Sequence, residues 1–143
     1  MTQGEFNRFC ATLPHTHHVV QWGGADVWKV GKQEARSSEA ATGTHKAKNK
    51  FKMFAIGWPD KKVEADEVMP ITFHCSDIGY EMLKDTPGCR PAPYLASRGM
   101  TWIQRTSDEG VSDTALKDYI KSSHRLMAAK LTKTLQRELG LLV

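Results

Sequence analysis

The stretch HHVVQWGGADVWKV, residues 17–30, carries the clearest structural signal in this chain. Two short runs rich in Val and Trp flank Gly23-Gly24, and glycines supply the backbone freedom that a tight turn between strands requires. His17–Trp22 and Ala25–Val30 are therefore predicted to form a β-hairpin. Two strands joined by so short a turn run antiparallel, which indicates an antiparallel sheet.

A helix is predicted before this hairpin, over Gln3–Leu13. Thr2 can accept a hydrogen bond from the first turn as an N-cap, and Pro14 ends the helix because proline disfavours helical angles in the residue before it. Apolar residues recur at spacings of three and four, which gives the helix one apolar face. These residues are Phe6, Phe9, Cys10 and Leu13.

Three further strands are predicted from runs of bulky apolar residues. They are Phe51–Trp58, Val68–Cys75 and Thr101–Thr106. The proline-rich segment Thr86–Pro93 is predicted to be a loop, because proline cannot donate to a strand ladder. Gly31–Lys50 contains no large apolar side chain that could anchor it in a core. It is predicted to be a mobile hairpin tip or insertion.

Two helical regions follow in the second half of the chain. Ser76 can cap a helix over Asp77–Asp85, whose expected inward residues are Ile78, Met82 and Leu83. After Ser112 the chain is predicted to be helical, and Ser122-Ser123 could mark a bend or a boundary between two helices. The apolar stripe of this tail consists of Leu116, Ile120, Met127, Leu131 and Leu135.

The predicted fold is an α+β domain of order α-β-β-β-β-α-β-α, with the last helix continuous or split. Hairpin-linked strands with helices at the ends favour an antiparallel sheet covered by helices on one face. The length of 143 residues suits one domain, 1–143. The expected core includes Trp28, Phe54, Phe73, Trp102 and Leu131.

Composition indicates a soluble, cytoplasmic protein. The hydrophobic share of 40% and charged share of 25% are close to globular averages. No apolar run approaches the roughly 20 residues that cross a bilayer, and the start MTQGEFNRF lacks the features of a secretory signal. The three cysteines include no CxxC pair, so free thiols are expected.

No recognised catalytic motif is present, so the chain is predicted not to be an enzyme. Gly31-Lys32 lacks the upstream glycine and the following Ser or Thr of a phosphate-binding loop, and GxSxG and HExxH are both missing. Cys89 is the best nucleophile candidate, because the neighbouring charge of Arg90 would lower a thiol pKa. His74 and Cys75 are neighbours in a strand, so their side chains point to opposite faces.

A metal site is also not predicted. His15, His17 and His18 lie close together, but no third ligand at a fixed spacing accompanies any pair of them. They are expected to be surface histidines at a helix–strand junction. No cofactor is predicted either.

Basic residues are the strongest functional signal. Lys117, Lys121 and Arg125 repeat every four residues and so share one helix face. Lysines also alternate along the end of the predicted loop, at Lys46, Lys48, Lys50 and Lys52. Such cations can contact phosphates, but a solvated helix face has the same pattern. The net charge of +4 is compatible with an anionic partner and falls short of the concentrated basicity typical of nucleic-acid binders.

The four tryptophans leave two readings open. Exposed aromatic rings beside basic residues can stack on nucleobases. Aromatic residues on strands more commonly pack in a core, which is the favoured interpretation here.

The chain as a whole resembles the MmcQ/YjbR family of small bacterial proteins. The resemblance rests on five segments, which are Leu13-Pro14, VWKVGK (27–32), KMFAIGW (52–58), PAPYLASRGMTWI (91–103) and SSHRLMAAKL (122–131). It implies a compact, CyaY-like sandwich of an antiparallel sheet with helices packed on it. Family members are commonly labelled DNA-binding, and the resemblance implies no established active site. This chain departs from the family pattern where Gln33–Lys50 is inserted between two strands.

The sequence therefore predicts a small binding protein that engages DNA without catalysis, through basic surface residues. The alternative is a protein–protein interaction module or chaperone-like adaptor with no nucleic-acid role. Steep salt dependence would distinguish a polyanion binder from an apolar protein interface.

Overall fold

The computed structural model of the chain describes residues 1–32, 50–59, 68–93, 95 and 100–141. Its helices and strands are α1 (Gln3–Ala11), β1 (Thr16–Gln21), β2 (Ala25–Gly31), β3 (Phe51–Gly57), β4 (Ile71–His74), α4 (Asp77–Leu83), β5 (Cys89–Pro91), β6 (Trp102–Arg105), α5 (Asp113–Ala128) and α6 (Lys133–Glu138). The prediction of a mobile loop falls mostly on residues 33–49, which lie outside the described part.

The strands form one six-stranded sheet of order β1-β2-β3-β4-β6-β5, and every neighbouring pair is antiparallel. The predicted hairpin is β1–β2, whose register runs from Gln21 opposite Ala25 to Thr16 opposite Val30. Its turn is closed by a hydrogen bond of 3.2 Å from the Gly24 amide to the Gln21 carbonyl. Trp22 and Gly23 both have positive φ, which is the conformation that such tight turns demand.

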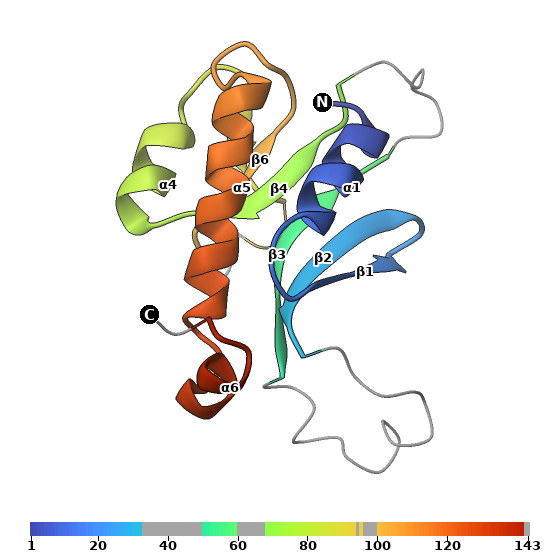
Figure 1. Ribbon diagram of the computed structural model, residues 1–143. Coiled ribbons are helices and arrows are strands. Elements are labelled where there is room, and N and C mark those ends of the chain that lie inside the picture. Colours follow the sequence, from blue (N-terminus) through green and yellow to red (C-terminus); the bar gives the residue numbers. More distant parts are fainter. Residues whose placement is uncertain (33–49, 60–67, 94, 96–99, 142–143) are drawn as a thin grey trace.

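Helices cover one face of this sheet, as the predicted fold class requires. Figure 1 shows α5 crossing in front of the strands, with α4 and α1 on either side of it. The amphipathic sequence of α5 explains this position, because its buried residues Leu116, Ile120 and Met127 lie along one side. Thr2, Ser76 and Ser112 cap α1, α4 and α5 through their side-chain oxygens.

The core lies between the helices and the sheet. All five predicted core residues are buried there, and none of Trp28, Phe54, Phe73, Trp102 and Leu131 is more than 7% exposed. A smaller apolar cluster of Ala25, Val27 and Ile56 packs with Trp58 and Leu95.

Two predictions about secondary structure and packing are wrong. Cys89–Pro91, predicted as loop, forms the short strand β5 and pairs with β6 through Arg90 opposite Gln104. Pro91 is tolerated in it because β5 is an edge strand. In α4, Leu83 is buried as expected, but Ile78 and Met82 are 76% and 66% exposed. The residue that joins Leu83 on the packed side is Tyr80.

The boundary suggested at Ser122-Ser123 does not exist, because α5 runs unbroken from Asp113 to Ala128. Ser123 is buried, and its hydroxyl donates to the Phe54 carbonyl (2.6 Å) and accepts from the His74 amide (2.9 Å). It thereby bridges β3 and β4 just beyond the Ala55–Phe73 pair. The helical tail breaks later, where Thr132 caps α6.

Candidate functional site

The outer side of α5 carries the first candidate site. Lys117, Lys121 and Arg125 are all exposed, because the apolar residues of the helix occupy the opposite side. An α-helix turns by about 100° per residue, so each four-residue step advances about 40° around the axis. The three cations, called here the basic stripe, therefore run obliquely along α5.

The basic stripe is held partly by a ring on α1. The ammonium nitrogens of Lys117 and Lys121 lie 5.7 and 6.0 Å from the centroid of the Phe9 ring. Cations within about 6 Å of an aromatic face are attracted by its quadrupole. The half-buried Phe9 thus orients both lysines without neutralising them.

None of the three cations is paired with a carboxylate of the described residues. The ion pairs of lysine there are Lys32–Glu138 (3.3 Å) and Lys84–Glu81 (2.7 Å), both outside the stripe. Asp118 is exposed on the same helix, yet no nitrogen of the stripe comes within ion-pair distance of it. The full positive charge of the stripe is therefore available to an anionic ligand.

The other predicted basic residues do not join this stripe. Lys46 and Lys48 lie outside the described residues. Lys50 is exposed and Lys52 half-buried at the start of β3, and the Lys50 carbonyl accepts from the Lys32 amide at 2.7 Å. Lys32 in turn pairs with Glu138 of α6, so these residues lie at the α6 end of the molecule. Figure 1 shows that end far from the amino terminus of α5.

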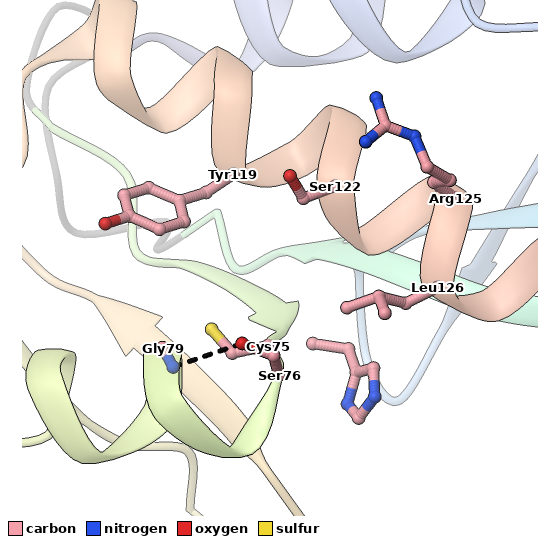
Figure 2. A pocket seen from close by; sticks show the side chains of 8 residues that line it. Cys75, Ser76, Gly79, Tyr119, Ser122, Arg125 and Leu126 are labelled. Carbon is pink, nitrogen blue, oxygen red and sulfur yellow. Dashed lines mark hydrogen bonds between the residues drawn. The ribbon is translucent and has the colours of Figure 1, made fainter.

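A pocket forms a second candidate site, between α5 and the junction of β4 with α4. Its volume is about 230 Å³. Figure 2 shows Tyr119, Ser122, Arg125 and Leu126 coming from α5, opposite Cys75, Ser76 and Gly79. His74 completes the lining.

His74 is the most unusual group in this pocket. Its Nδ1 atom is buried and has no hydrogen-bond partner among the described residues, while its ring lies 5.2 Å from Trp102 between centroids. Burial lowers the pKa of His74, and the nearby charge of Lys130 lowers it further. A backbone hydrogen bond with Thr101 opposes this shift without cancelling it, so burial favours the neutral imidazole.

Burial disfavours the thiolate form of all three cysteines. Burial raises the pKa of Cys75 to about 12 and also raises the pKa values of Cys10 and Cys89. The prediction that Arg90 lowers the pKa of Cys89 is wrong. The Arg90 Nε donates to Gln104 at 2.8 Å, and the charge that opposes burial at Cys89 comes from Arg105.

The histidine cluster near the first hairpin has structural contacts. The His18 Nε2 lies 2.7 Å from a carboxylate oxygen of the buried Asp26. Within the described residues, no group of three His, Cys, Asp or Glu side chains is placed to hold a metal ion.

The tryptophans divide between the two readings that the sequence left open. Trp28 and Trp102 are core residues, and Trp58 donates to the Thr72 hydroxyl at 3.0 Å. Trp22 is 60% exposed and stacks on Trp58 with ring centroids 5.9 Å apart. Only Trp22 therefore presents a large exposed ring.

Sequence reasoning located the basic stripe and missed the pocket. The stripe follows from a spacing of four within one helix. The pocket needs residues 74–79 and 119–126 together, and no local pattern shows that these segments meet.

These features define a small α+β domain with a six-stranded antiparallel sheet, helices on one face and a basic helix surface. A model of the YjbR family matches residues 11–126, so the chain belongs to the YjbR family. The resemblance to MmcQ/YjbR proteins is thereby confirmed.

Two solved structures share the fold. The protein DR2400 of Deinococcus radiodurans, assigned to domain family DUF419, has a TM-score of 0.69 at 21% identity, covering 99% of this chain and 89% of its own. A Pseudomonas syringae protein has a TM-score of 0.57 at 18% identity, covering 89% of this chain and 99% of its own. No curated protein matches the chain. In the part of the chain described, no helix has the length and apolar character to span a bilayer.

Proposed function

We propose that this protein binds nucleic acid without catalysis, through phosphate contacts from the basic stripe of α5. The observation that carries the proposal is that Lys117, Lys121 and Arg125 are exposed on one helix and unpaired with described carboxylates. A cation that is already neutralised by a carboxylate releases few counterions when it contacts a DNA phosphate. An unpaired cation releases more of them, and the entropy of these released ions favours binding.

The size of the stripe suits a few adjacent phosphates. Lys117 and Arg125 are eight residues apart, which corresponds to about 12 Å along a helix. One DNA strand carries a charge about every 3.4 Å along the axis, so a stripe of this length spans about three phosphates, one for each of its cations. Binding of this kind is salt-dependent and tolerant of sequence.

The test compares two variants that remove the same charge. Fluorescence anisotropy measures the affinity for a labelled 20-base-pair duplex between low and physiological salt. In the stripe variant K117Q/K121Q/R125Q we expect weaker binding, and a slope of log affinity against log salt that is flatter by about 0.9 for each lost contact. The control variant K84Q/K133Q/R137Q removes three cations elsewhere and should keep the wild-type slope.

Two results would contradict the proposal. One is the absence of wild-type binding to both duplex and single-stranded DNA at low salt. The other is equal weakening in both variants, which would show a response to net charge and not to the stripe.

One observation favours the alternative of a protein–protein interaction module. β1 is an edge strand of the sheet, and Val20 and Trp22 at its end are 61% and 60% exposed. Exposed strand edges with apolar side chains can pair with another chain. If this surface is the functional one, partner binding should be insensitive to salt and should weaken in Trp22→Ser.

A further inference from the structure

The pocket beside α5 adjoins the basic stripe, because Arg125 belongs to both. Arg125 lines the pocket together with Ser122 and Leu126 of the same helix. Figure 2 shows its guanidinium pointing away from Cys75 and Ser76, on the other side of α5. A ligand phosphate at Arg125 would therefore lie outside the pocket, with the group attached to it able to turn inward.

Apart from Arg125, whose charged group points away from it, the pocket is lined by uncharged side chains that can form hydrogen bonds. The hydroxyls of Tyr119 and Ser122 make no hydrogen bond to another described residue, and His74 lines the pocket with other atoms of its side chain, because its Nδ1 is buried. No carboxylate lines the pocket. These groups suit a neutral ligand with donors and acceptors on its edge.

The dimensions exclude a large ligand. Pockets for drug-sized molecules usually measure about 300–1,000 Å³, and this one is about 230 Å³. A single heterocyclic ring system is a suitable occupant. Apolar side chains such as Leu126 and aromatic ones such as Tyr119 provide the surfaces against which such rings pack.

We propose that this pocket holds one unpaired nucleobase of a strand whose phosphates contact the basic stripe, with His74, Tyr119 and Ser122 meeting the edge of the base. This inference deepens the proposed function, on which it rests, by naming single-stranded nucleic acid as the ligand class. A single strand suits the geometry, because its bases are free to turn out without breaking a pair.

The direct test uses small probes and the full chain. Thymidine 5′-monophosphate is titrated into isotope-labelled protein, and deoxyribose 5-phosphate, which lacks the base, is the matched control. We expect thymidine 5′-monophosphate to shift the NMR signals of His74, Tyr119 and Ser122. Deoxyribose 5-phosphate should move Arg125 and leave those three in place. Equal shifts with both probes, or no shift in the pocket with either, would overturn the proposal.

Two variants test the pocket with single-stranded DNA as the ligand. Ser122→Leu fills the pocket from an exposed position of α5, and Thr114→Leu places the same side chain at an exposed position outside it. For an oligothymidine strand we expect Ser122→Leu to lose roughly 5- to 150-fold in affinity, the range for removing one stacked base. Thr114→Leu should bind like the wild type. Equal binding by the two variants would refute the pocket assignment.

Duplex DNA separates this inference from the proposed function. Ser122→Leu should leave duplex affinity unchanged, while the stripe variant K117Q/K121Q/R125Q should weaken binding to duplex and single strand alike. Duplex binding that follows the stripe, combined with a Ser122→Leu variant that binds oligothymidine normally, would reject the pocket and retain the proposed function. If neither form of DNA binds, yet thymidine 5′-monophosphate still shifts the pocket signals, the proposed function fails and the pocket is a site for free nucleotides.

Discussion

At the residue scale, Ser123 illustrates how one side chain can complete a sheet. Its hydroxyl lies between the Phe54 carbonyl and the His74 amide, which belong to adjacent strands but do not bond to each other. Both backbone groups would otherwise be buried without a partner, which is costly away from water. This serine therefore has a structural role, whereas its neighbour Ser122 is exposed.

We expect Ser123→Ala to lower the free energy of unfolding by about 1–3 kcal/mol, since it leaves a buried donor and a buried acceptor unsatisfied. The matched control Ser122→Ala should change it by less than about 0.5 kcal/mol, as is usual at exposed positions. Urea denaturation at pH 7 measures both. Equal effects of the two substitutions would show that the Ser123 bridge contributes nothing to stability.

Arg105 is a charged residue with no exposed surface. Its Nε donates to the Val111 carbonyl at 2.8 Å, and its terminal nitrogen donates to Asp113 at 2.9 Å. Burial raises the pKa of Asp113, but hydrogen bonds from the α-amino group of Met1 and from Arg105 outweigh it and lower the pKa below its usual value. The pair fastens β6 to the first turn of α5.

At the element scale, α4 shows that helix formation and helix orientation have different origins. Ser76 caps the helix as the sequence indicates, so its existence is local. Which side packs inward is decided by the neighbouring elements, and that side carries Leu83 and Tyr80. Ile78 and Met82 are large and apolar, yet they face outward.

This orientation leads to opposite expectations for two aliphatic residues of α4. Leu83→Ala should cost about 2–5 kcal/mol of unfolding free energy, because it removes buried methyl groups and leaves a cavity. Ile78→Ala should change it by less than about 0.5 kcal/mol. Thermal and urea denaturation of the two variants provide the measurement. A large loss in Ile78→Ala would mean that this side of α4 is covered.

At the scale of the whole molecule, α5 connects most of the domain. It packs on β2, β3 and β4, and Lys117 and Lys121 reach over Phe9 of α1. His124 adds a link to the chain between α1 and β1, where its Nε2 donates to the Pro14 carbonyl at 2.8 Å. Its ring also meets Phe54 edge-on, with centroids 5.1 Å apart.

This central position predicts that mild acid destabilises the fold. Burial lowers the pKa of His124 and outweighs the hydrogen bond to the Pro14 carbonyl, which raises it, while His15 and Arg125 lower it slightly further. Burial also lowers the pKa of His74. Below about pH 6.5 the unfolded chain takes up protons that the folded one resists, so unfolding free energy falls as the pH decreases toward the folded values. Urea denaturation at pH 7 and pH 5 should show this loss.

The variant His124→Gln tests whether His124 causes part of this loss, because glutamine can still donate to the Pro14 carbonyl but does not titrate. We expect a smaller loss of stability between pH 7 and pH 5 than in the wild type. His15→Asn removes only one of the smaller contributions to the pKa shift of His124 and should keep most of the wild-type loss. A wild-type pH dependence that is unchanged in His124→Gln would show that this imidazole does not contribute.

Much of this fold is visible in the sequence, because its signals are local. Caps at Thr2, Ser76 and Ser112, glycines in the first hairpin and bulky residues in the strands act through neighbours within a few positions. The basic stripe is also predictable from local sequence, since a spacing of four places side chains on one side of a helix.

Contacts between distant segments were decided only by the tertiary structure. Ser123 meets His74 across 49 positions and Phe54 across 69, and β5 becomes a strand only because β6 lies beside it. The pocket around His74 likewise exists only where α5 crosses the β4–α4 junction. Sequence periodicity indicates which side of a helix or strand is apolar. The Ser123 hydrogen-bond bridge, the edge strand β5 and the pocket depend instead on which distant segment packs alongside, and the local sequence does not encode that.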